Sequence, residues 1–156
     1  AGGVGVITIP DIRWRRCDIK AVALLPNVLG KQRAVEAGAF EAWQVDDRGF
    51  VTEGTTTNAW IITKSGEVVT RNASEAILNG VTRLGVLEMI RHAGLGLSER
   101  SFTVAEAKAA SEAFLTSSSN FVLAVTRIDG EVIGSGQPGP VTRRLLQSYL
   151  ESGAAR

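Results

Sequence analysis

The sequence predicts an α/β domain in which a mixed sheet curls towards a barrel and helices surround it. Short runs of β-branched and apolar residues outnumber the helical patterns. Some runs are joined by tight turns and others by helices, which indicates both antiparallel and parallel neighbours. The 156 residues suit one domain, and no repeat, linker or low-complexity tract divides them. We therefore expect a single domain over residues 1–156.

The first elements are a strand and a helix. Residues 4–9 alternate small and β-branched side chains and stop at Pro10, which predicts a strand. Residues 25–37 have helical composition, with Pro26 tolerated in the first turn and Gly38 after the last.

Two hairpins follow, because each pair of apolar runs is separated by a turn sequence with glycine. The paired runs are 40–45 with 50–52, around Asp46-Asp47-Arg48-Gly49, and 59–63 with 68–70, around Lys64-Ser65-Gly66. Residues 82–92 place apolar side chains at helical spacing, and Gly94 is their predicted C-cap. The remaining predicted elements are a strand at 97–102, a helix at 104–111, strands at 113–115 and 121–128, a turn at Asp129-Gly130 into 132–133, and a helix at 141–150.

Composition excludes several classes of function. Lys and Arg number 17 against 16 Asp and Glu, so charge gives no reason to expect nucleic acid or an anionic membrane as partner. No apolar run approaches the roughly 18 residues that a membrane-spanning helix needs. Cys17 is the only cysteine and His92 the only histidine, which excludes an internal disulfide and a histidine-based metal site. We expect a cytoplasmic protein without a metal.

Lys20 is followed by five apolar residues, which is an unusual setting for a lysine. Desolvation would lower the pKa of its amine and make it nucleophilic near neutral pH, as a lysine that bonds to a carbonyl requires. The alternative is a lysine whose stem packs while its ammonium reaches water.

A second polar stretch follows a predicted strand, at Thr52-Glu53-Gly54-Thr55-Thr56-Thr57-Asn58. The Glu53 carboxylate suits a protonated ring nitrogen, with the threonine hydroxyls and Asn58 fixing its orientation. The alternative is a polar loop whose side chains bond their own backbone.

Two further stretches suit anions. Asn79-Gly80-Val81-Thr82-Arg83 precedes a helix, and the free N–H groups of a first helical turn favour phosphate. Thr116-Ser117-Ser118-Ser119-Asn120 places four hydroxyls between two strands, where they suit a phosphate or a substrate carboxylate. An ordinary capped helix and a solvated turn are the respective alternatives.

In this order the stretches resemble the fold-type IV pyridoxal-phosphate enzymes, and most of all the D-amino acid aminotransferases. Asp11-Ile12-Arg13-Trp14 followed by Cys17-Asp18-Ile19-Lys20 resembles the stretch that leads to the Schiff-base lysine in that family. Three stretches resemble the cofactor-binding stretches of the family: Thr52-Glu53-Gly54, Gly80-Val81-Thr82-Arg83 and Thr116-Ser117-Ser118-Ser119. Residues 125–133 with Pro138-Gly139-Pro140 resemble the C-terminal part of its fold. The sequence departs from the usual pattern of this family at two places. Thr55-Thr56-Thr57 stands where serines or small residues are usual, and Ala21-Val22-Ala23 replaces a more polar run.

The resemblance implies the C-terminal domain of the D-amino acid aminotransferase-like fold, pyridoxal 5′-phosphate as cofactor, and Lys20 as the Schiff-base lysine. It implies that Glu53 holds the pyridine nitrogen with Asn58 beside it, and that Leu78 packs on the ring face. Phosphate would be held by Val81, Thr82 and Ser118, with Arg13 as a further partner. Substrate would meet Ser117, Ser118 and Ser119.

The implied reaction moves an amino group from an amino acid, most of all a D-amino acid, to a 2-oxo acid. Alternatives on the same fold are branched-chain aminotransferase and aminodeoxychorismate lyase, and an alternative of another class is a non-catalytic cofactor-binding fragment. Family members are longer and carry an N-terminal domain that this chain lacks. The opening AGGVGVITIP, without Met, is likewise expected of a segment cut from something longer. A homodimer is expected by the same resemblance.

Overall fold

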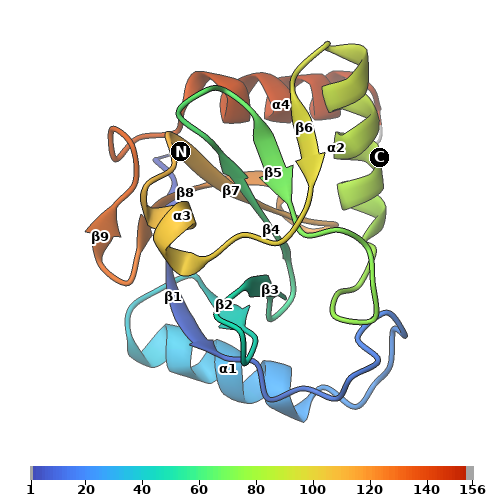
Figure 1. Cartoon of the computed structure of the whole chain (residues 1–156), viewed down its shortest axis with the longest axis vertical. Coiled ribbons are helices and arrows are strands. Elements are labelled where there is room, and N and C mark those ends of the chain that lie inside the picture. The colour runs from blue at the N-terminus through green and yellow to red at the C-terminus, as the bar shows by residue number, and fades with distance from the viewer. Residues whose placement is uncertain (1, 154–156) are drawn as a thin grey trace.

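The computed structural model describes residues 2–153 and consists of one sheet with helices on its faces (Figure 1). The elements follow one another in the order β1 (Val4–Pro10), α1 (Leu25–Glu36), β2 (Glu41–Val45), β3 (Val51–Gly54), β4 (Asn58–Ile62), β5 (Val68–Thr70), α2 (Val81–His92), β6 (Leu97–Glu99), α3 (Val104–Lys108), β7 (Glu112–Ser117), β8 (Phe121–Ile128), β9 (Glu131–Val132) and α4 (Pro140–Glu151). None of the helices within residues 2–153 is both long and apolar enough to cross a membrane.

The sheet is mixed, as the sequence predicts. Its strand order is β3-β2-β1-β8-β7-β4-β5-β6, and β9 pairs with β8. β1 runs parallel to both of its neighbours, β2 and β8. β7 is antiparallel to β8 and β4, β5 is antiparallel to β4, and β6 is parallel to β5.

The sheet curls because segments near its two ends are tied together. β3 ends the strand order on one side, yet only Thr55–Thr57 separate it from β4. The Gly54 amide closes this turn by donating to the Thr57 carbonyl at 2.7 Å. Phe50 forms a bridge with Thr103, beyond β6, which brings the opposite edge of the sheet against β3. The predicted curl towards a barrel is thus confirmed.

The two faces of the sheet have separate cores, and β4 contributes to both. Ala59 and Ile61 join the core on one face, which contains Trp43 and Phe102. Trp60, between them in sequence, belongs to the core on the other face, beneath α2 and α4. Alternate residues of a strand point to opposite faces, so a strand buried on both sides has a continuous apolar sequence.

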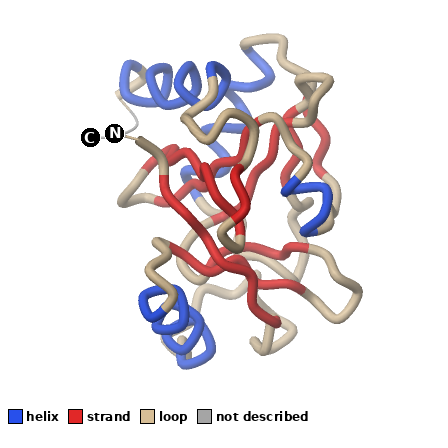
Figure 2. The backbone as a smooth tube through the Cα atoms, turned by 90° about the vertical axis from the view of Figure 1, so that its left-hand side faces the viewer, coloured by secondary structure: helices blue, strands red, loops and turns tan. Residues whose placement is uncertain are grey.

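The helices occupy different parts of the sheet. Figure 1 shows α2 and α4 next to each other at one end of the molecule and α1 at the other end. Figure 2 shows helices at these two ends after a quarter turn. α1 covers β1 and β2 at the other end through a small core of Ile9, Ala34 and Ala42. The segment 11–24 between β1 and α1 runs along the lower edge in Figure 1, close to the loop that precedes α2.

Two predicted elements end three residues earlier than expected. The strand predicted at 97–102 ends at Glu99 because the chain then leaves β5 and crosses towards β3, where Phe102 accepts a hydrogen bond from the Val51 amide. The helix predicted at 104–111 ends at Lys108. The Ser111 amide donates to the Ile62 carbonyl of β4, so this residue is hydrogen-bonded to the sheet and not within a helix.

Candidate active site

The four polar stretches of the sequence meet at one cavity of about 760 Å³. Its wall is built from the segment after β1, the turn between β3 and β4, the start of α2 and the turn between β7 and β8. The lining residues comprise Arg13, Trp14, Cys17, Ile19, Lys20, Ala21, Ala23, Leu24, Pro26, Asn27, Glu53–Asn58, Leu78–Thr82 and Thr116–Ser119. Every candidate site residue of the sequence analysis lies among them. A smaller hollow of about 460 Å³, lined by Arg16, Ser74 and Asn79, shows no such convergence.

Lys20 lines the cavity and is exposed, so of the two settings that its sequence leaves open the structure has the lysine that reaches water. The apolar residues after it do not fold over it. Val22 is 98% exposed and Leu24 51% exposed. They are exposed because they lie in the segment before α1, where no other described part of the chain covers them.

Glu53 is buried at the end of β3 and is held by three groups. Its Oε2 accepts a hydrogen bond from Asn58 Nδ2 at 2.9 Å. The Leu78 amide lies 3.1 Å from Oε1 and 3.2 Å from Oε2. Arg13 Nη1 lies 2.5 Å from Oε1. Asn58 also donates to the Leu78 carbonyl at 2.8 Å, so the carboxylate and the segment before α2 are fixed relative to each other.

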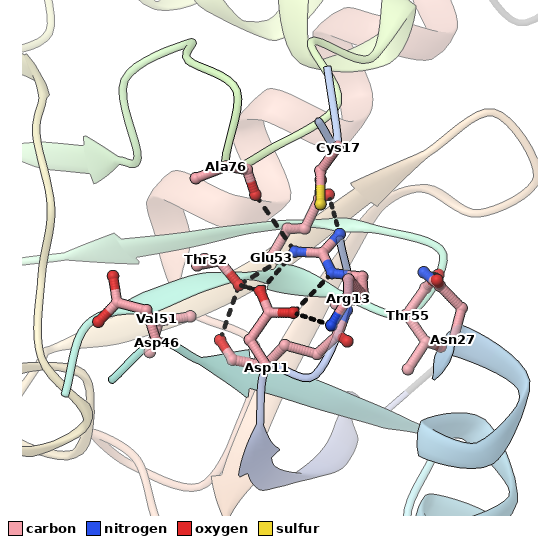
Figure 3. A network of polar contacts seen from close by, with 12 residues as sticks. Asp11, Arg13, Cys17, Asn27, Asp46, Val51, Thr52, Glu53, Thr55 and Ala76 are labelled. Carbon is pink, nitrogen blue, oxygen red and sulfur yellow. Dashed lines mark hydrogen bonds and ion pairs between the residues drawn. The ribbon is translucent and has the colours of Figure 1, made fainter. Parts of the chain in front are cut away.

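Arg13 is a partner of Glu53 in the structure, whereas the resemblance implied a place beside phosphate. Figure 3 shows its guanidinium among Asp11, Glu53, Thr52 and the Ala76 carbonyl. Nε and Nη2 bond the two oxygens of Asp11 at 2.9 and 2.7 Å, which is the bidentate geometry of a strong arginine–carboxylate pair. All three nitrogens are therefore engaged away from the start of α2.

The cluster has two carboxylates for one cation. Half-buried Asp11 and buried Glu53 share the single guanidinium of Arg13. Burial raises the pKa of Glu53 to about 7, although Arg13 acts to lower it. Burial also acts to raise the pKa of Asp11, but the hydrogen bonds and charge of Arg13 outweigh it and leave that pKa below its ordinary value. A ligand with a protonated ring nitrogen would supply the missing positive charge beside Glu53.

The start of α2 offers a site for an anion. Gly80 is its N-cap and no side chain caps the first turn, so backbone N–H groups there have no partner within the helix. Thr82 is 2% exposed, yet its Oγ1 has no hydrogen-bond partner in residues 2–153. A Cβ at Gly80 would lie 2.7 Å from Asn58 Oδ1, so this approach of the helix to Asn58 requires glycine. An orphaned buried hydroxyl at a helix N-terminus fits phosphate.

The turn between β7 and β8 places serine hydroxyls at the cavity. Ser117 Oγ accepts from the Asn120 amide at 3.1 Å and lies 3.3 Å from Ser119 Oγ. Ser118 is exposed, and its hydroxyl has no bond to any described residue. Phe121 has a φ of 54°, an uncommon conformation for a residue other than glycine, and it returns the chain into β8.

The three hydroxyls of the turn Thr55–Thr57 all bond the buried carboxylate of Glu41. The sequence left open a role in orienting a ring and bonds to the turn's own backbone, and it did not indicate this partner. Glu41 and Asp11 were absent from the sequence-based site. The sequence does show that Glu41 is an acidic residue at the start of an apolar strand and that Asp11 stands two residues before Arg13. Neither pattern indicates which residue the carboxylate bonds.

Comparison with known proteins agrees with this geometry. The family described as amino-transferase class IV matches residues 6–128, so the chain belongs to the class IV aminotransferases. The D-alanine aminotransferase of Bacillus licheniformis is 45% identical over 157 residues, covering 99% of this chain and 55% of that protein. The corresponding enzyme of Staphylococcus aureus (strain N315) is 42% identical over 154 residues, covering 96% and 54%. The chain thus spans about half the length of the curated relatives it matches.

Solved structures show the same fold. The branched-chain amino acid aminotransferase of Thermobaculum terrenum, in its PLP-form, has a TM-score of 0.87 and 28% identity, covering 96% of this chain and 50% of that one. The branched-chain aminotransferase of Thermoproteus uzoniensis with norvaline has a TM-score of 0.86 and 29% identity, covering 96% and 50%. The resemblance expected from the sequence and its fold are both confirmed.

Proposed function

We propose that this chain is the cofactor-binding half of a pyridoxal-phosphate-dependent aminotransferase that acts on a D-amino acid. One observation carries the proposal: a lysine, a buried carboxylate and an orphaned hydroxyl at a helix start, from three distant segments, line a single cavity. The cofactor is a phosphorylated pyridine with a carbonyl, and each of these groups suits one of its parts.

Different residues would bind different parts of the cofactor. Glu53 would pair with the ring nitrogen, and its bonds from Asn58 and Leu78 keep it in one orientation. Thr82 and the first turn of α2 would hold the phosphate, with Ser118 adding a hydroxyl. Leu78 would pack on the ring. Lys20, exposed at the cavity, would offer its amine to the carbonyl.

When bound, the cofactor accepts the electrons left on a substrate carbon that has lost its proton. Lys20 would take that proton from the substrate Cα and return one at the cofactor C4′, as general base and then general acid. Arg13, which Asp11 holds in place, would favour the ionised form of Glu53 beside the ring nitrogen. Ser117, Ser118 and Ser119 would face the substrate. Two such half-reactions move the amino group to a 2-oxo acid.

The relatives support a D-amino acid substrate over the alternatives. The D-alanine aminotransferase of Bacillus licheniformis reaches 45% identity, whereas the two branched-chain structures above reach 28% and 29%. Branched-chain aminotransferase is therefore the second candidate for the same reaction. A lyase on this fold, such as aminodeoxychorismate lyase, would use the same lysine for elimination.

We further propose that an N-terminal domain outside residues 1–156 covers the cavity and that the enzyme is a homodimer in the cytoplasm. Large apolar side chains at the cavity favour such a cover: Trp14 is 55% exposed, Ile19 44% and Leu24 51%. Exposed apolar patches of this kind mark sites of contact. Residues 1–156 alone, without that cover, would bind cofactor at most and would not turn over substrate.

Product analysis of the protein that carries this chain tests the function. Loaded with pyridoxal 5′-phosphate, it should transfer the amino group of D-alanine to 2-oxoglutarate and leave L-leucine nearly untouched. Faster transfer from L-leucine would favour the branched-chain enzyme. Release of pyruvate from aminodeoxychorismate, with no 2-oxo acid added as amino acceptor, would favour the lyase. Absence of all three reactions in a folded, cofactor-loaded protein would contradict the proposal.

A further inference from the structure

Glu41 is a buried acid that the proposed chemistry does not use. It opens β2, and its side chain has no exposed surface. Within residues 2–153 no lysine, arginine or histidine forms an ion pair with it, in contrast to Glu53 and Arg13. A buried carboxylate without a cation has to be satisfied by hydrogen-bond donors.

The donors come mainly from the turn between β3 and β4. Oε1 of Glu41 accepts from the Ala42 amide at 2.8 Å and from the Thr55 hydroxyl at 2.5 Å. Oε2 accepts from the Thr56 amide at 3.2 Å, the Thr56 hydroxyl at 3.1 Å and the Thr57 hydroxyl at 3.3 Å. Three consecutive hydroxyls thus donate to one carboxylate.

The turn is held tightly between Glu41 and α1. A Cβ at Gly54 would lie 2.1 Å from Thr57 Oγ1 and 3.1 Å from Glu41 Cδ, so only glycine allows this approach. On the α1 side, Asn27 Nδ2 donates to the Thr55 carbonyl at 2.7 Å. Glu41 therefore supports one wall of the cavity, which Thr55, Thr56 and Thr57 all line.

A threonine hydroxyl has one hydrogen and two lone pairs. Because Thr55, Thr56 and Thr57 give their hydrogens to Glu41, they can only accept hydrogen bonds from a ligand. The negative charge of Glu41 lies behind them. The wall therefore suits an ammonium or another N–H donor and is unfavourable to a carboxylate. The start of α2, with the free hydroxyl of Thr82, has the opposite preference.

We infer that Glu41 is a positioning residue that makes the wall of Thr55–Thr57 an acceptor surface for a protonated amine. The inference rests on the proposed function, in which an amino group enters and leaves this cavity. It gives the cavity two chemically different sides, one with donors for phosphate and one with acceptors for the amine.

Two related probes test the inference by binding alone: pyridoxamine 5′-phosphate, which carries an amine, and 4-pyridoxic acid 5′-phosphate, which carries a carboxylate in its place. Their affinities would be measured in the wild-type protein that carries this chain and in its Glu41→Gln variant. Glutamine replaces one acceptor by an NH₂ donor that faces donors, so hydroxyl hydrogens should turn into the cavity. The ratio of the two affinities, in favour of the amine, should fall about tenfold, which corresponds to about 1.4 kcal/mol.

Glu112→Gln is the matched control. Glu112 is also buried and accepts from a threonine hydroxyl, Thr142 Oγ1 at 2.7 Å, but it holds the start of α4 and does not line the cavity. This variant should lose stability and keep the wild-type affinity ratio. An unchanged ratio in a folded Glu41→Gln protein would overturn the inference and leave Glu41 a purely structural residue.

NMR tests the hydrogen-bond directions without any ligand. The hydroxyl protons of Thr55 and Thr57 should exchange slowly with water in the wild type and in Glu112→Gln, and fast in Glu41→Gln. Fast exchange in the wild type would also overturn the inference. If neither probe binds any form of the protein, the cofactor proposal fails and the exchange rates decide the role of Glu41 alone.

Discussion

Arg13 Nη1 lies 2.5 Å from Glu53 Oε1, and both side chains are buried, with 6% and 7% of their surface exposed. Arg13 belongs to the segment that leads to Lys20, whereas Glu53 lies at the end of β3. The pair therefore ties the lysine-bearing segment to the residue proposed to hold the ring nitrogen. Asp11 grips Arg13 from the opposite side, so the guanidinium has a single orientation.

Replacing Arg13 by methionine should destabilise the fold strongly. Glu53 would remain buried without its cation, and breaking a buried pair in this way typically costs about 3–5 kcal/mol. Urea unfolding above neutral pH measures the loss. Arg16→Met is the control, because Arg16 pairs with Asp18 at the surface and should contribute little. Equal losses in the two variants would show that the Arg13 pair is as weak as a surface pair.

The raised pKa of Glu53 should make the ligand-free fold less stable as pH rises. Between the ordinary value of 4.5 and about 7, the folded protein keeps a proton that the unfolded chain has released. The free energy of unfolding therefore falls across this window, by up to about 3 kcal/mol at about 1.36 kcal/mol per pH unit. The lowered pKa of Asp11 acts only below 3.8, outside the window.

Glu53→Gln removes the titrating group and should flatten this part of the stability profile. Urea unfolding of both proteins from about pH 5 to about pH 8 gives the comparison. Parallel profiles for wild type and variant would mean that Glu53 titrates near its ordinary pKa in the folded protein.

Thr82→Val should weaken phosphate binding and leave the fold intact. The Thr82 hydroxyl is buried without a partner among the described residues, so an apolar group of the same shape should be neutral or slightly stabilising. Affinity for pyridoxal 5′-phosphate should fall about tenfold, the effect of one hydrogen bond to a charged group. Affinity for pyridoxal, which lacks the phosphate, should not change. Equal weakening of both ligands would place the phosphate elsewhere.

The sequence predicts the backbone of this protein better than its side-chain partners. β4 and α2 lie where local patterns predict them, because an apolar run or a helical repeat is a property of neighbouring residues. The pairs Arg13–Glu53 and Glu41–Thr55 join residues distant in the chain, and no local pattern records them. The sequence left open whether Lys20 is buried or exposed for a similar reason, since its exposure depends on what packs over the segment and not on its composition.

Glu53→Gln should also slow the chemical step. Without an anion at the ring nitrogen, the ring would accept electrons from the substrate Cα less well. If most of the about 3–5 kcal/mol of a broken buried pair is felt in the transition state, the half-reaction should slow roughly 10²–10⁴-fold. An α-deuterated substrate should show a larger isotope effect than in the wild type. A wild-type rate in the folded, cofactor-loaded variant would remove Glu53 from the mechanism.

The most direct measurement is to fix the cofactor to the protein and find the residue that carries it. The protein that contains this chain would be loaded with pyridoxal 5′-phosphate, reduced with borohydride, digested and mapped by mass spectrometry. We expect the label on Lys20, none in Lys20→Ala, and undiminished labelling in the control Lys64→Ala, whose side chain lies in an exposed turn away from the cavity. The turnover of Lys20→Ala should also fall by more than about 10²–10⁴-fold, the usual contribution of acid–base catalysis alone. A label on another lysine, or undiminished labelling and turnover in Lys20→Ala, would contradict this expectation.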